Sequence, residues 1–137
     1  MDVKAVVSTQ TPDFESDVVE MTRADALEHF SSWPWQKHLD RQQAMEAAGE
    51  EACPPNMSFG VGDRHAFVMN VGPGIFDLHV SASKTSRRFG VFTKKETLDW
   101  DVAGATAGLA ARFIEAIYGD DDEAFIAFAD SNSTGAY

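Results

Sequence analysis

Residues 56–94 read NMSFGVGDRHAFVMNVGPGIFDLHVSASKTSRRFGVFTK, and apolar residues alternate with polar ones along most of this segment. Alternation with a period of two is typical of β-strands that bury one face. Turn residues interrupt the pattern at 62–63 (Gly-Asp), 72–74 (Gly-Pro-Gly) and 83–84 (Ser-Lys). The segment therefore predicts a four-stranded antiparallel meander.

The three turns determine which residues face each other across the predicted sheet. They place Phe59 opposite Ala66, Val68 opposite Leu78, and Leu78 opposite Phe89. All three turns put the same apolar residues on one face, namely Met57, Phe59, Val61, Ala66, Val68, Phe76, Leu78, Val80, Phe89 and Val91. We expect this face to form the core, with helices packed against it.

The opposite face of the predicted meander mixes polar, charged and aromatic side chains: Ser58, His65, Phe67, Met69, Asp77, His79, Ser81, Arg88 and Phe92. His65 is the diagonal neighbour of His79 in this register, and Asp77 points to the same side. A carboxylate with two imidazoles can bind a transition metal or transfer protons, and it can equally belong to a half-covered, hydrogen-bonded sheet face. We favour the structural interpretation and predict no catalytic residue, no metal and no cofactor.

The residues before the meander predict two helices. The first covers 23–31, with Thr22 as the first residue of a capping box, and the second covers 34–48 with a proline in its first turn. Residues 1–8 predict a short edge strand, and 9–20 predict a loop.

The residues after the meander predict further helices. The longest covers 97–118, because Thr97 or Asp99 can cap it and an apolar stripe runs along it: Val102, Leu109, Phe113, Ile114 and Ile117. A short helix over about 120–130 and a frayed tail over 131–137 follow. The predicted fold is a single α+β domain over 1–137, in which this long C-terminal helix packs on the meander.

Composition favours a cytoplasmic protein. The chain has 137 residues, 44% of them hydrophobic, and a single cysteine, so it has no internal disulfide framework. It begins without a basic segment followed by an apolar run, which a signal peptide requires. Its longest apolar stretch, residues 102–111, is shorter than the roughly 20 residues of a membrane span.

Charge is unevenly distributed along the chain, which carries a net charge of −11. Residues 84–95 contain five basic residues and no acidic one, while 1–51 contain eleven acidic against four basic residues and 96–137 contain nine against one. Such acidity argues against nucleic acid and anionic membranes as partners and favours a basic protein partner. We interpret the basic stretch as an internal partner of the acidic segments or as protection of an edge strand.

Three further motifs have structural interpretations. Residues 72–74 form a turn and not a phosphate loop, because no Lys-Ser/Thr and helix follow them. Ser58 and Ser81 share a face with the histidines, but no nucleophile-elbow pattern surrounds them. Cys53, before two prolines, is typical of a buried free cysteine more than of a haem ligand.

These features favour a small acidic protein-binding module. The specific hypothesis is an immunity or inhibitor-type protein that masks a basic partner such as a toxic effector enzyme. Alternatives are a secretion-chaperone-like adaptor, a small enzyme that uses the Asp/His face, and a homodimer or larger assembly in which the basic hairpin docks on acidic helices of a neighbour. Such chaperones return to strands after their middle helix, whereas this chain is predicted to continue as helix after residues 97–118, which favours the inhibitor over the chaperone.

Two surfaces are the predicted partner-binding sites. One lies at the end of the second helix and comprises Glu46, Glu50 and Glu51. The other lies on the mixed face and comprises Asp77, His79 and Arg88. Trp33, next to Pro34 and Trp35, is a candidate aromatic anchor, because tryptophan dominates interface hot spots, although both rings can equally cover the mixed face.

Overall fold

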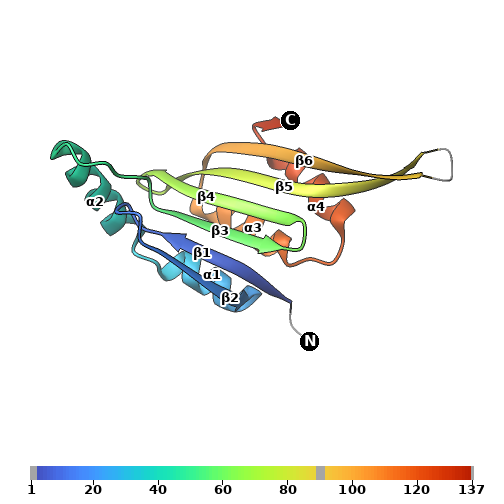
Figure 1. The fold of residues 1–137 in the computed structure, drawn as a ribbon, viewed down its shortest axis with the longest axis horizontal. Helices are drawn as coiled ribbons and strands as arrows, with labels where there is room; N and C mark the ends of the chain where they lie inside the picture. The colour runs from blue at the N-terminus through green and yellow to red at the C-terminus, as the bar shows by residue number, and fades with distance from the viewer. Residues whose placement is uncertain (1–2, 89–91, 137) are drawn as a thin grey trace.

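Seven antiparallel strands form one sheet within the residues that the computed structural model describes, which are 3–88 and 92–136 (Figure 1). The strand order is β2-β1-β3-β4-β5-β6-β7. The strands are β1 (Lys4–Gln10), β2 (Ser16–Thr22), β3 (Asn56–Val61), β4 (Arg64–Gly72), β5 (Ile75–Arg88), β6 (Phe92–Ala105) and β7 (Gly135–Ala136). The helices are α1 (Arg23–Ser32), α2 (Trp35–Ala47), α3 (Ala107–Ile117) and α4 (Asp122–Asn132). The side chains of residues 86–88, 92 and 136 lie outside this description.

The general α+β class is correct, but the predicted four-stranded meander is wrong. Six strands of six or more residues and the short β7 make up the sheet in the described part of the chain. The N-terminal hairpin widens the sheet, since β1 pairs with both β2 and β3. Residues 16–20, predicted as loop, belong to β2. Their sequence does not alternate, so pairing with β1 and not the local pattern sets their conformation.

The first two predicted turns and their register are confirmed. Phe59 pairs with Ala66 across β3 and β4, and Val68 pairs with Leu78 across β4 and β5. Gly62 and Gly74 adopt positive φ values of 57° and 68°, the left-handed conformation that glycine takes most readily. Turn chemistry therefore fixed this part of the sheet locally.

The predicted turn at 83–84 is wrong. β5 runs through it to residue 88 and β6 returns from residue 92, so that Ser83 pairs with Thr97 in one long hairpin. Leu78 accordingly pairs with Val102 and not with Phe89, which, like Val91, lies outside the described residues. Serine and lysine have no special turn geometry, and strand pairing over fourteen residues outweighs their weak turn preference.

The first half of the predicted helix 97–118 is strand β6. Leu98, Trp100 and Val102 alternate with polar residues, and Asp99 and Asp101, which suggest a helix N-terminus, are the polar members of that alternation. α3 begins ten residues later than predicted, after Thr106, whose Oγ1 accepts the Leu109 N–H at 3.1 Å. The tail also differs from the prediction, since Ala136 pairs with Trp100.

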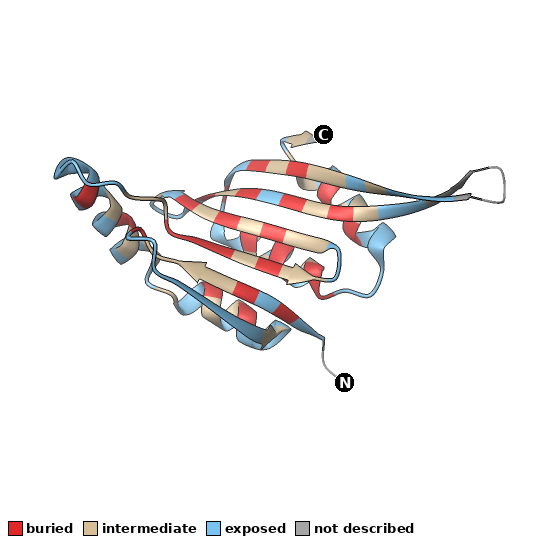
Figure 2. Ribbon diagram, in the orientation of Figure 1, coloured by how far each residue is buried: buried red, intermediate tan, exposed pale blue. Residues whose placement is uncertain are grey.

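The two N-terminal helices are confirmed. Thr22 caps α1 by accepting the Asp25 N–H at 3.3 Å, and Pro34 precedes α2. α1, α3 and α4 lie against one face of the sheet, whose apolar residues are buried beneath them (Figure 2). The core contains Ala5, Val7, Met57, Phe59, Ala66, Val68, Phe76, Leu78, Val80, Trp100, Val102, Phe113, Ile114, Ile117 and Phe125. The described residues of the predicted apolar face therefore lie on the covered face of the sheet.

Candidate functional site

The other face of the sheet carries no helix in the described part of the chain and is turned toward the viewer in Figure 1. Cross-strand pairing builds two rows of side chains on it. One row is Val18, Ser8, Ser58, Phe67, His79 and Asp101, and the other is Glu20, Val6, Gly60, His65, Ser81 and Asp99. Together with Met69 and Asp77 beside them, these residues form what we call the open face.

His79 lies between two carboxylates on the open face. Its Nδ1 is 2.9 Å from Asp101 Oδ1, and its Nε2 is 3.0 Å from Asp99 Oδ1. A neutral imidazole has one N–H, so both contacts are hydrogen bonds only when the ring is protonated. The bonds to Asp101 and, after it, to Asp99 raise the pKa of His79 above its ordinary value, although partial burial acts in the opposite direction. The cluster therefore favours an imidazolium between two aspartates.

His65, the neighbour of His79 on β4, has the opposite electrostatic environment. Burial lowers the pKa of His65, and the charge of His79 lowers it further. Its Nε2 is 2.6 Å from Ser58 Oγ on β3. A serine–histidine contact of this length is the first element of a nucleophile and base pair, but catalysis also needs a concave site that excludes water. These side chains instead lie on an open sheet face, which favours a structural hydrogen bond.

Asp77 has a structural partner on β6. Its Oδ1 accepts the backbone N–H of Gly104 at 2.9 Å, beside an irregularity in the pairing of β5 with β6. Gly104 has a φ of 66°, as expected where an extra residue is accommodated in a strand. Asp77 therefore lies on the open face, as predicted. The carboxylates that contact His79, however, are those of Asp99 and Asp101.

Asp99 and Asp101 are the residues that sequence reasoning missed. Their alternation with Leu98, Trp100 and Val102 is the pattern of a strand. Acidic residues before an apolar run are also typical of a helix N-terminus, and this second pattern led to the prediction of a helix. Read as a strand, the same residues place both carboxylates on the side of the sheet that carries His79.

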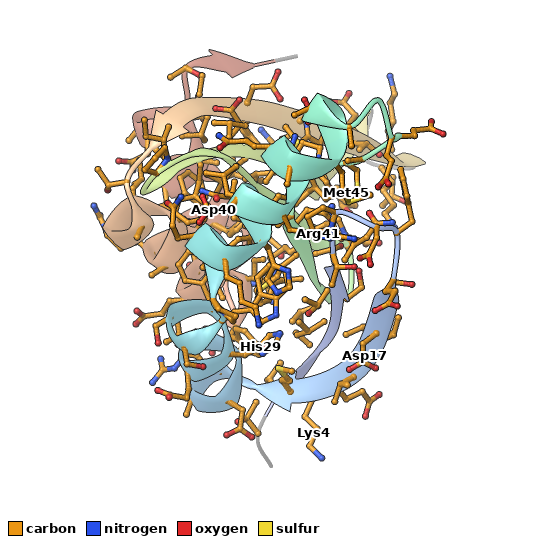
Figure 3. All side chains as sticks on the ribbon, turned by 90° about the vertical axis from the view of Figure 1, so that its left-hand side faces the viewer. Lys4, Asp17, His29, Asp40, Arg41 and Met45 are labelled. Atoms are coloured by element: carbon orange, nitrogen blue, oxygen red, sulfur yellow. The ribbon has the colours of Figure 1, made fainter. Side chains whose placement is uncertain are left out.

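The acidic end of α2 is a separate surface. Glu46, Glu50 and Glu51 are exposed there, and Glu46 accepts a 2.7 Å hydrogen bond from Gln42 Nε2. α2 crosses the near end of the molecule in Figure 3, where Asp40 and Arg41 are labelled on it. Strands alone build the open face, so these glutamates are not part of it.

Trp33 belongs to an aromatic cluster next to α2. Its ring stacks on His38 with centroids 4.2 Å apart and meets Trp35 edge-on at 4.6 Å. The ring is half-buried. Trp33 therefore contacts its own chain extensively and keeps part of its ring exposed.

Two lysines of the basic stretch form ion pairs within the chain. Lys95 Nζ lies 2.8 Å from Asp63 Oδ2 in the turn between β3 and β4, and Lys94 Nζ lies 3.6 Å from Glu96 Oε1. Both strands of the hairpin extend beyond the helices in Figure 1. Arg88, a predicted site residue, ends β5, and its side chain lies outside the described residues.

Comparison with known proteins finds no matching family model, no matching curated protein and no matching solved structure. Within residues 3–88 and 92–136, His, Cys, Asp and Glu side chains form no group of three or more that could hold a metal ion. None of the helices in those ranges has both the length and the apolar character needed to cross a bilayer. The open face therefore has to be interpreted from its own chemistry.

Proposed function

We propose that this chain is a small acidic protein-binding module of the immunity or inhibitor type, and that its open face receives a basic partner protein. The single observation that carries the proposal is the composition of an uncovered sheet face. A solvated face of an antiparallel sheet is ordinarily polar. Here Val6 on β1 and Val18 on β2 are 52% and 63% exposed, and Phe67 and Met69 on β4 are half-buried.

The charges on the open face support a cationic partner. Asp99 and Asp101 lie at the β6 side of the open face and Glu20 at the β2 side, with Val6 and Phe67 on strands between them. Acidic residues at two sides of the face are positioned to pair with basic residues of a partner. With a net charge of −11, the chain attracts basic partners and accelerates their association.

The enzyme alternative has one supporting contact, the short distance between Ser58 and His65. A flat face favours protein binding over catalysis, because a catalytic group needs a pocket that orients the substrate and excludes water. We therefore retain the binding function, and we place the protein in the cytoplasm, where its lone Cys53 stays reduced.

The test is affinity capture from the native lysate with three tagged proteins at low and moderate salt, read by mass spectrometry. They are the wild type, the open-face double variant Asp99→Asn/Asp101→Asn, and the matched variant Asp120→Asn/Glu123→Gln, which removes the same charge near α4. We expect one stoichiometric basic partner that the wild type and the α4 variant retain and the open-face variant loses. Equal retention by all three would contradict docking on the open face, and no partner at either salt would contradict a binding function.

A further inference from the structure

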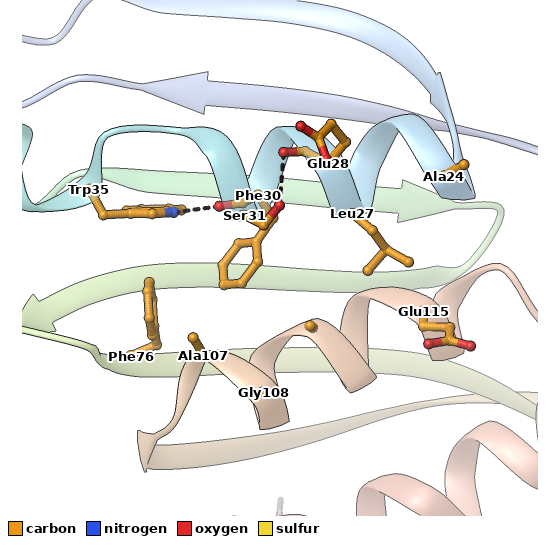
Figure 4. A pocket seen from close by; sticks show the side chains of 11 residues that line it. Ala24, Leu27, Glu28, Phe30, Ser31, Trp35, Phe76, Ala107, Gly108 and Glu115 are labelled. Carbon is orange, nitrogen blue, oxygen red and sulfur yellow. Dashed lines mark hydrogen bonds between the residues drawn. The ribbon is translucent and has the colours of Figure 1, made fainter.

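A second surface lies on the helical side of the sheet, where α1 and α3 leave a groove of about 660 Å³ between them (Figure 4). Aromatic side chains close one end of the groove. Phe30 and Phe76 have ring centroids 5.3 Å apart, and Trp35 meets both rings edge-on. The Trp35 indole N–H donates to the Phe30 carbonyl at 2.8 Å, which fixes the ring in place. These contacts hold the aromatic end of the groove in place.

Three of the four α3 residues that line the groove are small, namely Ala107, Gly108 and Ala111. A Cβ atom added to Gly108 would meet only Thr106 Oγ1, at 3.8 Å, so no packing contact within the described chain requires glycine there. Glycine is less favourable than alanine inside a helix. Its presence leaves the groove open and lets another backbone approach α3 closely.

The groove has an acidic rim. Glu28 on α1 and Glu115 on α3 line it, and the lining includes no basic side chain among the described residues. Arg23 reaches Glu115 from outside the lining at 3.8 Å, and both side chains of this pair are more than half exposed. Such an exposed pair is weak and readily exchanges partners. The groove thus presents an apolar floor with carboxylates on either side.

We propose that this groove binds a basic amphipathic helix of a partner protein. The lining residues recur at positions 24, 27, 28 and 31 of α1 and at 107, 108, 111 and 115 of α3, which is helical spacing over about two turns. An apolar stripe on a third helix packs against two such helices, with Lys or Arg beside the stripe pairing with Glu28 and Glu115. The proposal is independent of the open face, which lies on the other side of the sheet.

The test uses a 14-residue peptide with leucines at helical spacing and lysines elsewhere, titrated into the full-length ¹⁵N-labelled protein. We expect amide shifts to concentrate on the lining residues of α1 and α3. The same peptide with glutamate in place of lysine should bind at least 10-fold more weakly. Loss of this difference would overturn the electrostatic part of the proposal, and shifts confined to the open-face strands would overturn the groove as the site.

Three variants make the test specific. Ala111→Leu and Gly108→Leu fill the groove from adjacent turns of α3 and should each weaken the lysine peptide at least 10-fold. Ala47→Leu adds the same side chain on exposed α2 and should change the affinity less than 2-fold. The spectrum of each free variant reports whether it is folded, so failure of one filling variant to fold leaves the other decisive. Unchanged affinity in a folded filling variant would overturn the proposal. Hexylammonium is a second control: if it produced the same shifts at equal affinity, the groove would be a site for small amines and not for a helix.

Discussion

The same strands contribute side chains to both faces of the sheet, but the two faces differ in burial. On the covered face, even positions of β4 and β5 such as Ala66, Val68 and Val80 are completely buried. On the open face, the neighbouring odd positions Phe67 and His79 are half-buried or exposed and meet polar and acidic residues. The covered face thus supplies the buried core, whereas the side chains of the open face stay accessible to other molecules.

The largest expected difference between the faces is in stability. Phe59→Ala on the covered face should lower the free energy of unfolding by about 3–5 kcal/mol, because Phe59 is fully buried and its loss leaves a cavity. Phe67→Ala on the open face should cost about 1 kcal/mol, because the ring is half-buried. Urea denaturation of both variants measures the contrast, and equal losses would remove the distinction between the faces.

The next effect is on partner association. Asp99→Asn/Asp101→Asn should slow association with the captured partner about 10-fold at low salt, because these carboxylates belong to the proposed interface. Asp120→Asn/Glu123→Gln carries the same change of charge on the helical side and should leave the rate nearly unchanged. Stopped-flow association at two salt concentrations separates the two, and identical rates would refute the assignment to the open face.

The acidic end of α2 is a predicted second contact with a smaller role. Reversing charge at Glu50 and Glu51 should slow association a few-fold at low salt with little loss of stability, since both side chains are exposed. The same stopped-flow experiment measures this effect. An unchanged rate at low salt would remove α2 from the interface.

The covered side also contains a position that is not optimised for stability. Gly108→Ala should raise the free energy of unfolding by about 0.5–1 kcal/mol, because alanine is the better helix former and the added methyl group has room. Thermal or urea unfolding measures the gain. A loss of stability would mean that Gly108 is required by the fold itself.

The smallest effect concerns the proton on His79. Its folded-state pKa is raised, so its bonds to Asp99 and Asp101 stabilise the protein fully below the unfolded pKa of about 6.5 and lose this contribution as pH rises through the folded pKa. His79→Gln should therefore cost a few tenths of a kcal/mol more at pH 5.5 than at pH 9, since such partly exposed pairs are weak.

NMR titration of the two histidine rings provides the direct readout for this prediction. His79 should titrate above about 6.5 and His65 below it, because their environments shift the two pKa values in opposite directions. Coincident midpoints would show that the two aspartates do not hold the proton on His79.

The two faces also differ in how far sequence could predict them. Glycine-containing turns and strict alternation gave the register of β3, β4 and the first half of β5, and with it the covered face and the neighbourhood of His65 and His79. β2 and the first half of β6 were not predictable in this way. Their local sequences fit a loop and a capped helix, and pairing with distant strands outweighs those preferences.

The same error explains what was missed in the candidate site. If residues 97–105 are predicted as helix, Asp99 and Asp101 are not placed in the sheet. Asp77 is then the one carboxylate that the prediction puts near His79. The residues on the central strands were placed correctly because local turns fix those strands. The two aspartates depend on a long-range pairing that sequence pattern alone does not specify.

Hydroxyl-radical footprinting of the protein, free and bound to its captured partner, tests whether the partner docks on the open face. Met69 and Phe67 report on the open face, Met57 and Phe59 on the covered face, and all four lie in β3 or β4. We expect Met69 and Phe67 to lose most of their oxidation in the complex, while the buried Met57 and Phe59 stay unreactive in both states. Unchanged oxidation of Met69 and Phe67 in a stoichiometric complex would contradict it.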